Sequence, residues 1–463
     1  NEEHEENEEN EENEENEENE ENEENVENEE NEEKNAIKPK YVASGTYGCY
    51  YYPRVPCDSM SVDDVERMDQ QEILGSKVQK NDELLESEIE NVKKLATNVE
   101  NHRLYFLLPK KVCVLEMQSL NKVSDCKVLT QAGGFGLGAG SLGGAGVENS
   151  LMKDTKELKR MSNDEVKKHS DMSVMAFEYD KNAKYINMLL PNLAGQMDIK
   201  TYLKTLPNER KWSGMTNCYT HILNALKHLK DNRIVHWDLH SDNIIINEKD
   251  GIPYIIDFGL SIDVTQPKKR YLISNSFRIQ LDLERWTFET QFLMWAHTIL
   301  RNKVLHDKLD MDDPNVKAEY SKQVAVILKS LVQNFSCLQI CSDAFRKAYY
   351  DGVFDFYKDL TMRHCLSDIL WLGWSTWDNY SVSVLFLGLL CSMYSPAFSI
   401  DNAMMQDFFS LLVQNIHYDW RSRNSVEKSI ERMDVITRKS YHMEDVIMMR
   451  QVPCFKEGRS CPE

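Results

Sequence analysis

Apolar residues recur at helical spacing in three parts of the chain. Residues 82–97 carry a stripe that predicts an amphipathic helix, formed by Leu85, Ile89, Val92 and Leu95. Residues 213–232 carry a longer stripe that predicts a second helix, with Tyr219, Ile222, Leu223, Leu226 and Leu229 facing inward. The longest apolar run, near residues 382–390, is shorter than the roughly 20 residues of a membrane span and predicts a buried helix.

Shorter apolar runs bounded by turn residues predict β-strands. Residues 41–52 are rich in Tyr, Val, Gly, Thr and Cys and predict two strands joined by a tight turn. Residues 185–191 predict a buried strand. Residues 244–246 and 254–256 are apolar and flank Asp250-Gly251, a pair typical of hairpin turns. The sequence therefore predicts a β-hairpin at this place.

Three polar side chains stand at one end of this predicted hairpin. Asp238 precedes the first strand, Asn243 comes directly before it, and Asp257 follows the second strand. Transfer of a γ-phosphoryl group needs metal ions that neutralise phosphate charge, and carboxylate and amide oxygens bind Mg²⁺. It also needs a carboxylate that orients the attacking hydroxyl and accepts its proton. Asn243 and Asp257 suit the metal, and Asp238 suits the hydroxyl.

The net charge of −22 belongs almost entirely to the N-terminal tail. Residues 1–35 hold 21 Glu and one Lys, so the remainder of the chain is close to neutral. The Glu-Glu-Asn repeat cannot bury apolar surface and its charges repel, so we expect a disordered tail rather than a helix. The tail serves as a solvating or partner-binding segment, or it has no role. A near-neutral remainder argues against nucleic acid as the main ligand.

Glycine dominates residues 131–150. A phosphate cradle is one interpretation, but no Lys-Ser or Lys-Thr follows, so the Walker pattern fails. We expect instead a flexible insertion between strands.

The region of the hairpin resembles the protein kinase family. The family's catalytic loop reads His-Arg-Asp-Leu, three further residues and Asn; residues 236–239 read His-Trp-Asp-Leu, and Asn243 follows after three residues. The family's Asp-Phe-Gly motif is complete at residues 257–259. The resemblance covers about residues 40–435 and implies that Asp238 is the catalytic base and that Asn243 and Asp257 bind the metal.

The implied fold is α+β, the bilobal protein kinase fold with a small β-rich N-lobe and a larger helical C-lobe behind a disordered acidic tail. We expect the tail over residues 1–35. The N-lobe is expected over residues 36–191, with the Gly-rich insertion near 125–170. The C-lobe is expected over residues 192–463, with a helical insertion near 297–373.

The resemblance extends to a nucleotide-binding loop. Residues 43–50 are similar to the family's Gly-rich loop, with Gly45 and Gly48 at its second and third glycines and Thr46 and Tyr47 between them. Glycine lets backbone amides approach the phosphates of ATP closely. Ala43 replaces the first glycine, which is a departure from the family.

The remaining ATP-binding residues are also implied by the resemblance. Lys77 is the best match for the strand lysine, paired with Glu88 of the predicted helix, although Glu83, Glu86 and Glu90 compete for that role. Leu190 is expected to be the gatekeeper beside the adenine. Asn192 and Leu193 follow it in the expected adenine-facing hinge, residues 191–195.

Three further residues match structural positions of the family. Residues 286–289 resemble the Ala-Pro-Glu end of the activation segment, which implies that Glu289 pairs with Arg423. Asp378 resembles the buried Asp that braces the catalytic loop.

Two departures leave alternatives open. Trp237 replaces the Arg that usually binds a phosphorylated activation loop, and His240 replaces the catalytic-loop Lys that steadies the γ-phosphate. The sequence around His240 also resembles aminoglycoside and choline kinases, which phosphorylate small molecules. A pseudokinase scaffold is the other alternative, motivated by Ala43 and Tyr50. The complete Asp-Phe-Gly motif favours a protein substrate, and the three intact polar residues favour an active enzyme.

The resemblance thus implies a protein kinase that uses ATP and Mg²⁺, with Ser/Thr as the default acceptor in a protein substrate. Residues 45–53, the region of Lys77 and residues 190–203 look similar to kinases of nucleocytoplasmic large DNA viruses. Eleven cysteines without a CxxC pair suit a reducing compartment, so we expect a cytoplasmic location, in the host cytoplasm or virion if the protein is viral. We expect no membrane span. The sequence does not indicate an oligomeric state.

Overall fold

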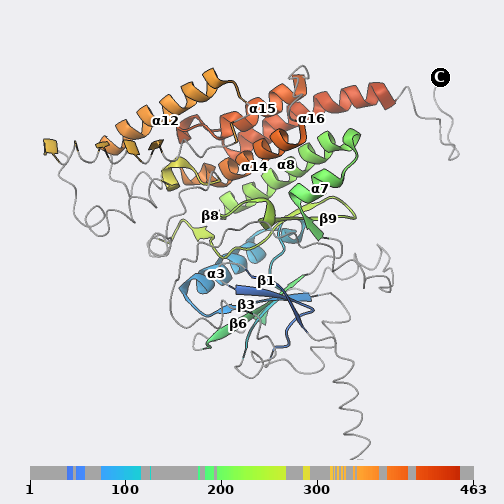
Figure 1. Cartoon of the computed structure of the whole chain (residues 1–463). Helices are drawn as coiled ribbons and strands as arrows, with labels where there is room; N and C mark the ends of the chain where they lie inside the picture. The colour runs from blue at the N-terminus through green and yellow to red at the C-terminus, as the bar shows by residue number, and fades with distance from the viewer. Residues whose placement is uncertain are drawn as a thin grey trace, which may run out of the picture. The chain divides into compact units, whose positions relative to one another are not determined.

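The computed structural model describes residues 39–44, 48–57, 74–115, 126, 176–177, 183–191, 196–266 and 285–291, scattered residues from 313 to 338, and residues 341–363, 373–394 and 403–448 (Figure 1). The chain divides into two compact units. The first comprises residues 1–80, 112–161 and 177–189, and the second comprises residues 81–111, 162–176 and 190–463. The acidic tail and nearly all of the Gly-rich insertion lie outside the described residues.

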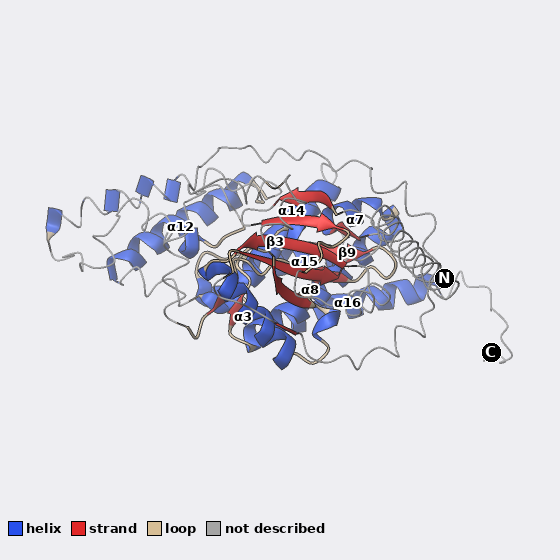
Figure 2. Cartoon of the chain, turned by 90° about the horizontal axis from the view of Figure 1, so that it is seen from below, coloured by secondary structure: helices blue, strands red, loops and turns tan. Residues whose placement is uncertain are grey.

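The first unit is built on a six-stranded sheet with the strand order β1-β2-β3-β6-β4-β5. The strands are β1 (Lys40–Ser44), β2 (Gly48–Tyr52), β3 (Leu74–Lys80), β4 (Lys111–Val114), β5 (Ala176–Phe177) and β6 (Tyr185–Pro191). The strands β1, β2 and β3 pair antiparallel, and Tyr50 lies opposite Lys77. The strands lie side by side when the chain is viewed from below (Figure 2).

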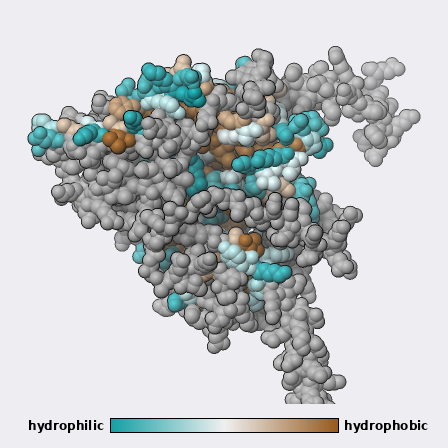
Figure 3. Space-filling model, in the orientation of Figure 1, coloured by the Kyte–Doolittle hydropathy of each residue, from teal (hydrophilic) through white to brown (hydrophobic). Residues whose placement is uncertain are grey.

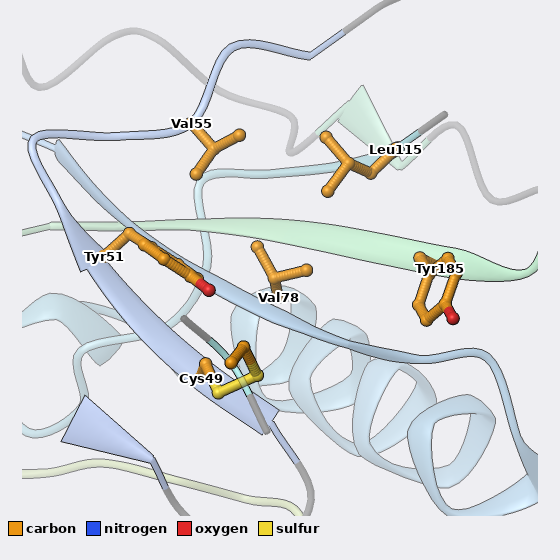
Figure 4. Close-up of a cluster of buried hydrophobic side chains, with 7 residues drawn as sticks. Cys49, Tyr51, Val55, Val78, Leu115 and Tyr185 are labelled. Atoms are coloured by element: carbon orange, nitrogen blue, oxygen red, sulfur yellow. A yellow bond between two sulfur atoms is a disulfide. The ribbon is translucent and has the colours of Figure 1, made fainter. Parts of the chain in front are cut away.

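Two disulfides join strands of this unit to distant segments. Cys49 of β2 bonds to Cys126, and Cys57 bonds to Cys113 of β4. Cys49 and Cys126 belong to a buried apolar cluster with Tyr51, Val78 and Tyr185, among others (Figure 4). Two disulfides among these cysteines run against the interpretation that the cysteines suit a reducing compartment. The partners are 77 and 56 residues apart, so tertiary folding brings them together.

The second unit holds the helices. They are α3 (Glu83–Asn98), α7 (Ile199–Thr205), α8 (Asn208–Asp231), α12 (Asp343–Arg363), α14 (Trp377–Tyr394), α15 (Ala403–Asn415) and α16 (Val426–Met448). On the face shown in Figure 3, hydrophilic residues lie over parts of α8 and α12, and apolar residues show between the helices. Among the described residues, no helix is long and apolar enough to cross a membrane.

Helix α8 runs through the core of this unit, where it contacts α14 and α16 (Figure 1). Its Tyr219 is fully buried, and the phenolic oxygen lies 3.1 Å from Ser383 Oγ of α14 and accepts a hydrogen bond from Asn415 Nδ2 of α15 at 2.9 Å. Buried polar groups need such partners. These hydrogen bonds fix the relative positions of α8, α14 and α15, of which α14 carries Asp378.

Two small sheets lie beside α8. The strands β7 (Gln196–Asp198), β9 (Ile244–Asn247) and β10 (Pro253–Ile255) form a three-stranded sheet in the order β10-β9-β7. The strands β8 (Ile234–Val235) and β11 (Ile262–Asp263) form a two-stranded one. Strands β9 and β10 are the predicted hairpin, and Gly251 in its turn has a φ of 70°, which favours glycine.

Most predicted elements are confirmed within a residue or two. Helix α3 begins after Asp82, whose side chain accepts hydrogen bonds from the first-turn amides of Leu84 and Leu85. Helix α8 begins five residues earlier than predicted because its exposed first turn carries no apolar stripe. Helix α12 supports the helical character of the insertion near 297–373.

Candidate active site

The carboxylate of Asp378 holds the loop that carries Asp238. Asp378 lies in the first turn of α14, and its oxygens accept hydrogen bonds from the backbone amides of His236 at 2.8 Å and Trp237 at 3.0 Å. Trp237 has a φ of 66°, an unfavourable value for a bulky residue. Strain of this kind persists only where the surroundings impose it, and it is common at functional sites. The bracing role predicted for Asp378 is confirmed.

The imidazole ring of His236 links the Asp238 loop to the strand before Asp257. Its Nδ1 accepts a hydrogen bond from the backbone amide of Asp238 at 3.3 Å, so Nε2 carries the proton and donates to the carbonyl of Ile256 at 2.9 Å. His236 is fully buried. One side chain thus fixes the spacing between the two acidic residues.

Asn243 is also fixed by the same loop. Its Nδ2 donates to the backbone carbonyl of Asp238 at 2.8 Å and lies 3.4 Å from the Asp238 carboxylate. The backbone carbonyl of Asn243 accepts a hydrogen bond from Ile256 at 3.1 Å, next to Asp257. Because Nδ2 is used within the loop, the amide oxygen is the atom that Asn243 offers to a cation.

Asp257 presents an exposed carboxylate from a constrained backbone. It has a φ of 60°, and its Oδ1 accepts a hydrogen bond from the Gly259 amide at 3.2 Å. The next residue, Phe258, is buried edge-on against Phe106 and His236, with ring centres 5.8 and 5.0 Å away. Packing of Phe258 therefore anchors the turn that directs Asp257 outward.

Two basic side chains surround the carboxylate of Asp238. Arg285 Nη2 lies 2.8 Å from Oδ1, and His240 Nε2 lies 3.7 Å from Oδ2. Burial raises the pKa of Asp238, but the interaction with His240 and the charge of Arg285 outweigh it and lower the pKa below its ordinary value. Asp238 is therefore ionised at neutral pH, as a hydroxyl-orienting base must be.

Two contacts anchor the end of the segment that follows Asp257. Glu289 and Arg423 form the predicted ion pair, with Nη1–Oε1 and Nη2–Oε2 distances of 2.5 and 2.9 Å. Trp286 Nε1 donates to the backbone carbonyl of Trp237 at 2.7 Å. The segment is thereby joined both to the helical core and to the Asp238 loop.

The predicted nucleotide-binding residues are described only in part. Gly45, Thr46, Tyr47, Asn192 and Leu193 lie outside the described residues. Gly48 begins β2, where a side chain would lie 2.6 Å from the carbonyl of Val78, so β3 itself requires glycine there. Leu190 lies on β6 and is half-buried.

Lys77 and Glu88 belong to different units, and their pairing stays a prediction. Lys77 lies on β3, as expected of a strand lysine. Glu88 lies on α3 and is 4% exposed, whereas Glu83 and Glu90 are exposed.

The donor atoms beside Asp238 fit a magnesium ion. Mg²⁺ prefers oxygen ligands and is commonly held by one or two carboxylates together with phosphate oxygens and water. The Asn243 amide and the Asp257 carboxylate supply two such oxygens. Among the described residues, no group of three or more His, Cys, Asp or Glu forms a competing metal site.

Arg285 is a site residue that the sequence analysis did not identify. Its signal is faint, because an arginine just before Trp286 matches no motif of the resemblance. Asn91 was also missed; its Nδ2 donates to the backbone carbonyl of Ser261 at 3.0 Å and fixes α3 against the segment after Asp257.

The braced loop places an ionised Asp238 beside the amide of Asn243, next to the exposed carboxylate of Asp257. In comparison with known proteins, residues 148–432 match the family described as protein kinase domain. This match spans more than half of the chain, so the chain belongs to the protein kinase family. Its content of strands and helices fits the fold with a β-rich lobe and a helical lobe.

Short stretches of the chain are similar to curated protein kinases. One is 36% identical over 77 residues to the serine/threonine-protein kinase PITSLRE of Drosophila melanogaster, covering 16% of this chain and 8% of the relative. Another is 33% identical over 73 residues to the membrane-associated tyrosine- and threonine-specific cdc2-inhibitory kinase of the same organism, covering 16% and 13%. A third is 38% identical over 55 residues to serine/threonine-protein kinase prpf4B of Dictyostelium discoideum, covering 12% and 7%. The matched stretches thus span only small parts of these relatives.

Proposed function

We propose that this chain transfers the γ-phosphate of ATP to Ser or Thr hydroxyls of a protein substrate. The observation that carries the proposal is the state of the Asp238 carboxylate. Its Oδ1 lies 2.8 Å from Arg285 Nη2 yet accepts no hydrogen bond from the described residues, while the group is held ionised. An ionised carboxylate with unused lone pairs can accept a hydrogen bond from a hydroxyl.

The roles of the residues follow from their positions. Asp238 orients the acceptor hydroxyl and takes its proton as the oxygen attacks phosphorus. Asn243 and Asp257 would hold Mg²⁺, which neutralises charge on the phosphates of ATP. Asp378 and His236 contribute by positioning, because they hold the loop between these groups.

A protein acceptor is favoured over a small molecule. The buried Glu289–Arg423 pair and Trp286 fix the segment that follows the complete Asp-Phe-Gly motif. Protein kinases have this Ala-Pro-Glu segment, and the aminoglycoside and choline kinases that the sequence also resembles usually lack it. Two of the three similar relatives are named serine/threonine kinases and one is named tyrosine- and threonine-specific, so Thr is common to all three names.

The test is phosphate transfer from labelled ATP by the purified chain with Mg²⁺. Generic basic protein and casein would be compared with choline and an aminoglycoside as acceptors, and acid-stable phosphoamino acids would be identified. Asp238→Asn is the inactive control, because loss of general-base catalysis costs roughly 10²–10⁴-fold in rate. Labelling of the small acceptors alone would overturn the proposal. ATP binding without any transfer would favour a pseudokinase scaffold.

Source and location remain proposals. The similarity of residues 45–48 to kinases of large DNA viruses supports a viral origin. A cytoplasmic location, in a host cell or virion, is a prediction that the two disulfides call into question, because disulfides are rare in reducing compartments.

A further inference from the structure

The position that carries a lysine in the resembled catalytic loop is occupied by His240, whose Nε2 lies 3.7 Å from the Asp238 carboxylate. Histidine carries a positive charge only when its imidazole is protonated. A guanidinium group stays protonated at every pH at which the protein is folded. The described permanent cation that contacts Asp238 is Arg285, with Nη2 2.8 Å from Oδ1.

The backbone around Arg285 is fixed on both sides. Its carbonyl oxygen accepts a hydrogen bond from Ser381 Oγ of α14 at 2.6 Å. The next residue, Trp286, is buried and hydrogen-bonded to the carbonyl of Trp237 in the Asp238 loop. The guanidinium also lies over the Trp286 ring, 5.6 Å from its centre. The charge is thus preorganised at the carboxylate rather than recruited from a flexible surface chain.

The two carboxylate oxygens of Asp238 have different neighbours. Oδ1 contacts Arg285 Nη2 as an ion pair, and no hydrogen bond from the described residues reaches Oδ1 or Arg285 Nε. Oδ2 faces His240 and Asn243. An arginine in this place holds a positive charge against one oxygen, while the catalytic loop contacts the other.

We propose that Arg285 is the positioning residue of Asp238 and supplies the fixed positive charge that the lysine of the resembled loop supplies elsewhere in the family. This inference rests on the proposed phosphotransfer function. Arg285 would thus act in the reaction although it lies outside the catalytic loop, residues 236–243. His240 then does not need to supply the positive charge beside Asp238. Instead it caps the turn that follows it, where its Nδ1 accepts a hydrogen bond from the Asp242 amide at 3.3 Å.

The first test compares Arg285→Gln with Arg285→Lys. The neutral variant should lower kcat at least about tenfold, less than the roughly 10²–10⁴-fold loss expected for the base itself, with little change in the KM for ATP. The lysine variant should keep most of kcat. Arg421→Ala is a matched control, because Arg421 lies 2.8 Å from Asp419 and over the ring of Trp420, yet has no contact with Asp238. It should leave kcat within about twofold.

The second test asks whether the charge can be moved. The double variant Arg285→Gln/His240→Lys places a cation at position 240, where the catalytic loop of the family has a lysine. It should recover most of the kcat that Arg285→Gln loses. If the double variant recovers no activity, Arg285 does not take the place of the catalytic-loop lysine. If Arg285→Gln is as active as the parent, Arg285 does not position Asp238. If Arg285→Gln is more active than the parent, the contact with Asp238 is inhibitory, which also rejects the positioning role.

The third test does not depend on turnover. The Asp238 carboxyl can be titrated by ¹³C NMR of aspartate-labelled protein, with Asp238→Asn used to assign its signal. Burial raises the pKa of Asp238, and His240, Arg285 and His236 together lower it, so Arg285→Gln should raise the pKa. The acidic limb of kcat should move to higher pH in parallel. If the parent has no activity, the proposed function fails. Separately, if the pKa of Asp238 is the same in Arg285→Gln as in the parent, the contact with Arg285 is rejected.

Discussion

Arg423 and Glu289 form a bidentate ion pair in which both side chains are completely buried. Tyr357 and Trp377 also donate hydrogen bonds to the Glu289 carboxylate, at 2.7 and 3.1 Å. Desolvation of two charges is costly, and such a pair is retained only when its remaining polar capacity is satisfied. The pair joins the end of the segment after Asp257 to the loop before α16.

Glu289→Gln should destabilise the helical unit by roughly 3–5 kcal/mol, because it leaves the Arg423 charge buried without its partner. Equilibrium unfolding in urea measures the change. Arg421→Ala, which removes a largely exposed ion pair, should cost about 1 kcal/mol or less. Equal losses in the two variants would contradict the importance of burial at Glu289.

Asp257→Asn should abolish stabilisation by Mg²⁺-ATP while preserving the fold. Asparagine tolerates the φ of 60° at this position, so the change removes charge without adding backbone strain. A ligand that binds only the native state raises the melting temperature, and loss of the metal ligand removes that rise. Asp231→Asn, an exposed carboxylate on α8, is the control and should respond like the parent. A normal thermal shift in Asp257→Asn would reject its role as metal ligand.

The two disulfides of the sheet unit should be intact and stabilising in protein prepared without reductant. Crosslinks between partners 77 and 56 residues apart restrict the unfolded chain and contribute about 2–4 kcal/mol each. Dithiothreitol should therefore lower the melting temperature of the parent. It should leave unchanged a variant with serine at positions 49, 57, 113 and 126. Alkylation of all eleven cysteines in the untreated protein would exclude both disulfides.

The sequence predicted the parts of the site that depend on local order. Asp238, Asn243 and Asp257 stand within 20 residues around one hairpin, so the spacing of two strands places them together. The Glu289–Arg423 pair was reached only through the resemblance, because 134 residues separate its members. The bracing of the catalytic loop by Asp378, 141 residues from Trp237, was reached in the same way.

Contacts set by tertiary structure alone escaped prediction. Arg285 meets Asp238 because α14 and the Trp286 hydrogen bond place its backbone, and neither feature is visible in the spacing of residues. The pairing of Cys57, which lies beyond the end of β2, with Cys113 of β4 depends on how the chain folds back onto the sheet. Side-chain patterns specify elements well, whereas partners across elements follow from how those elements pack.

The last prediction concerns control by phosphorylation. In the resembled kinases, an arginine in the catalytic loop binds a phosphate on the activation segment. Here Trp237 holds that position, and it is 4% exposed, with its ring 5.8 Å from the ring of Trp377 and 6.3 Å from that of Trp286. Aromatic packing and the hydrogen bond from Trp286 thus hold the end of the segment without a phosphate.

We therefore expect the enzyme to be active as synthesised. The purified protein would be treated with a broad phosphatase, mass spectrometry would confirm that residues 261–285 carry no phosphate, and the initial rate should stay within about twofold of the untreated enzyme. A neutral indole cannot bind a dianionic phosphate as a guanidinium does, since it offers a single N–H donor. A rate that falls tenfold after dephosphorylation and recovers on rephosphorylation would contradict this expectation. Trp286→Phe removes the hydrogen bond to Trp237 but keeps an aromatic ring, so it should lower kcat more than phosphatase treatment does.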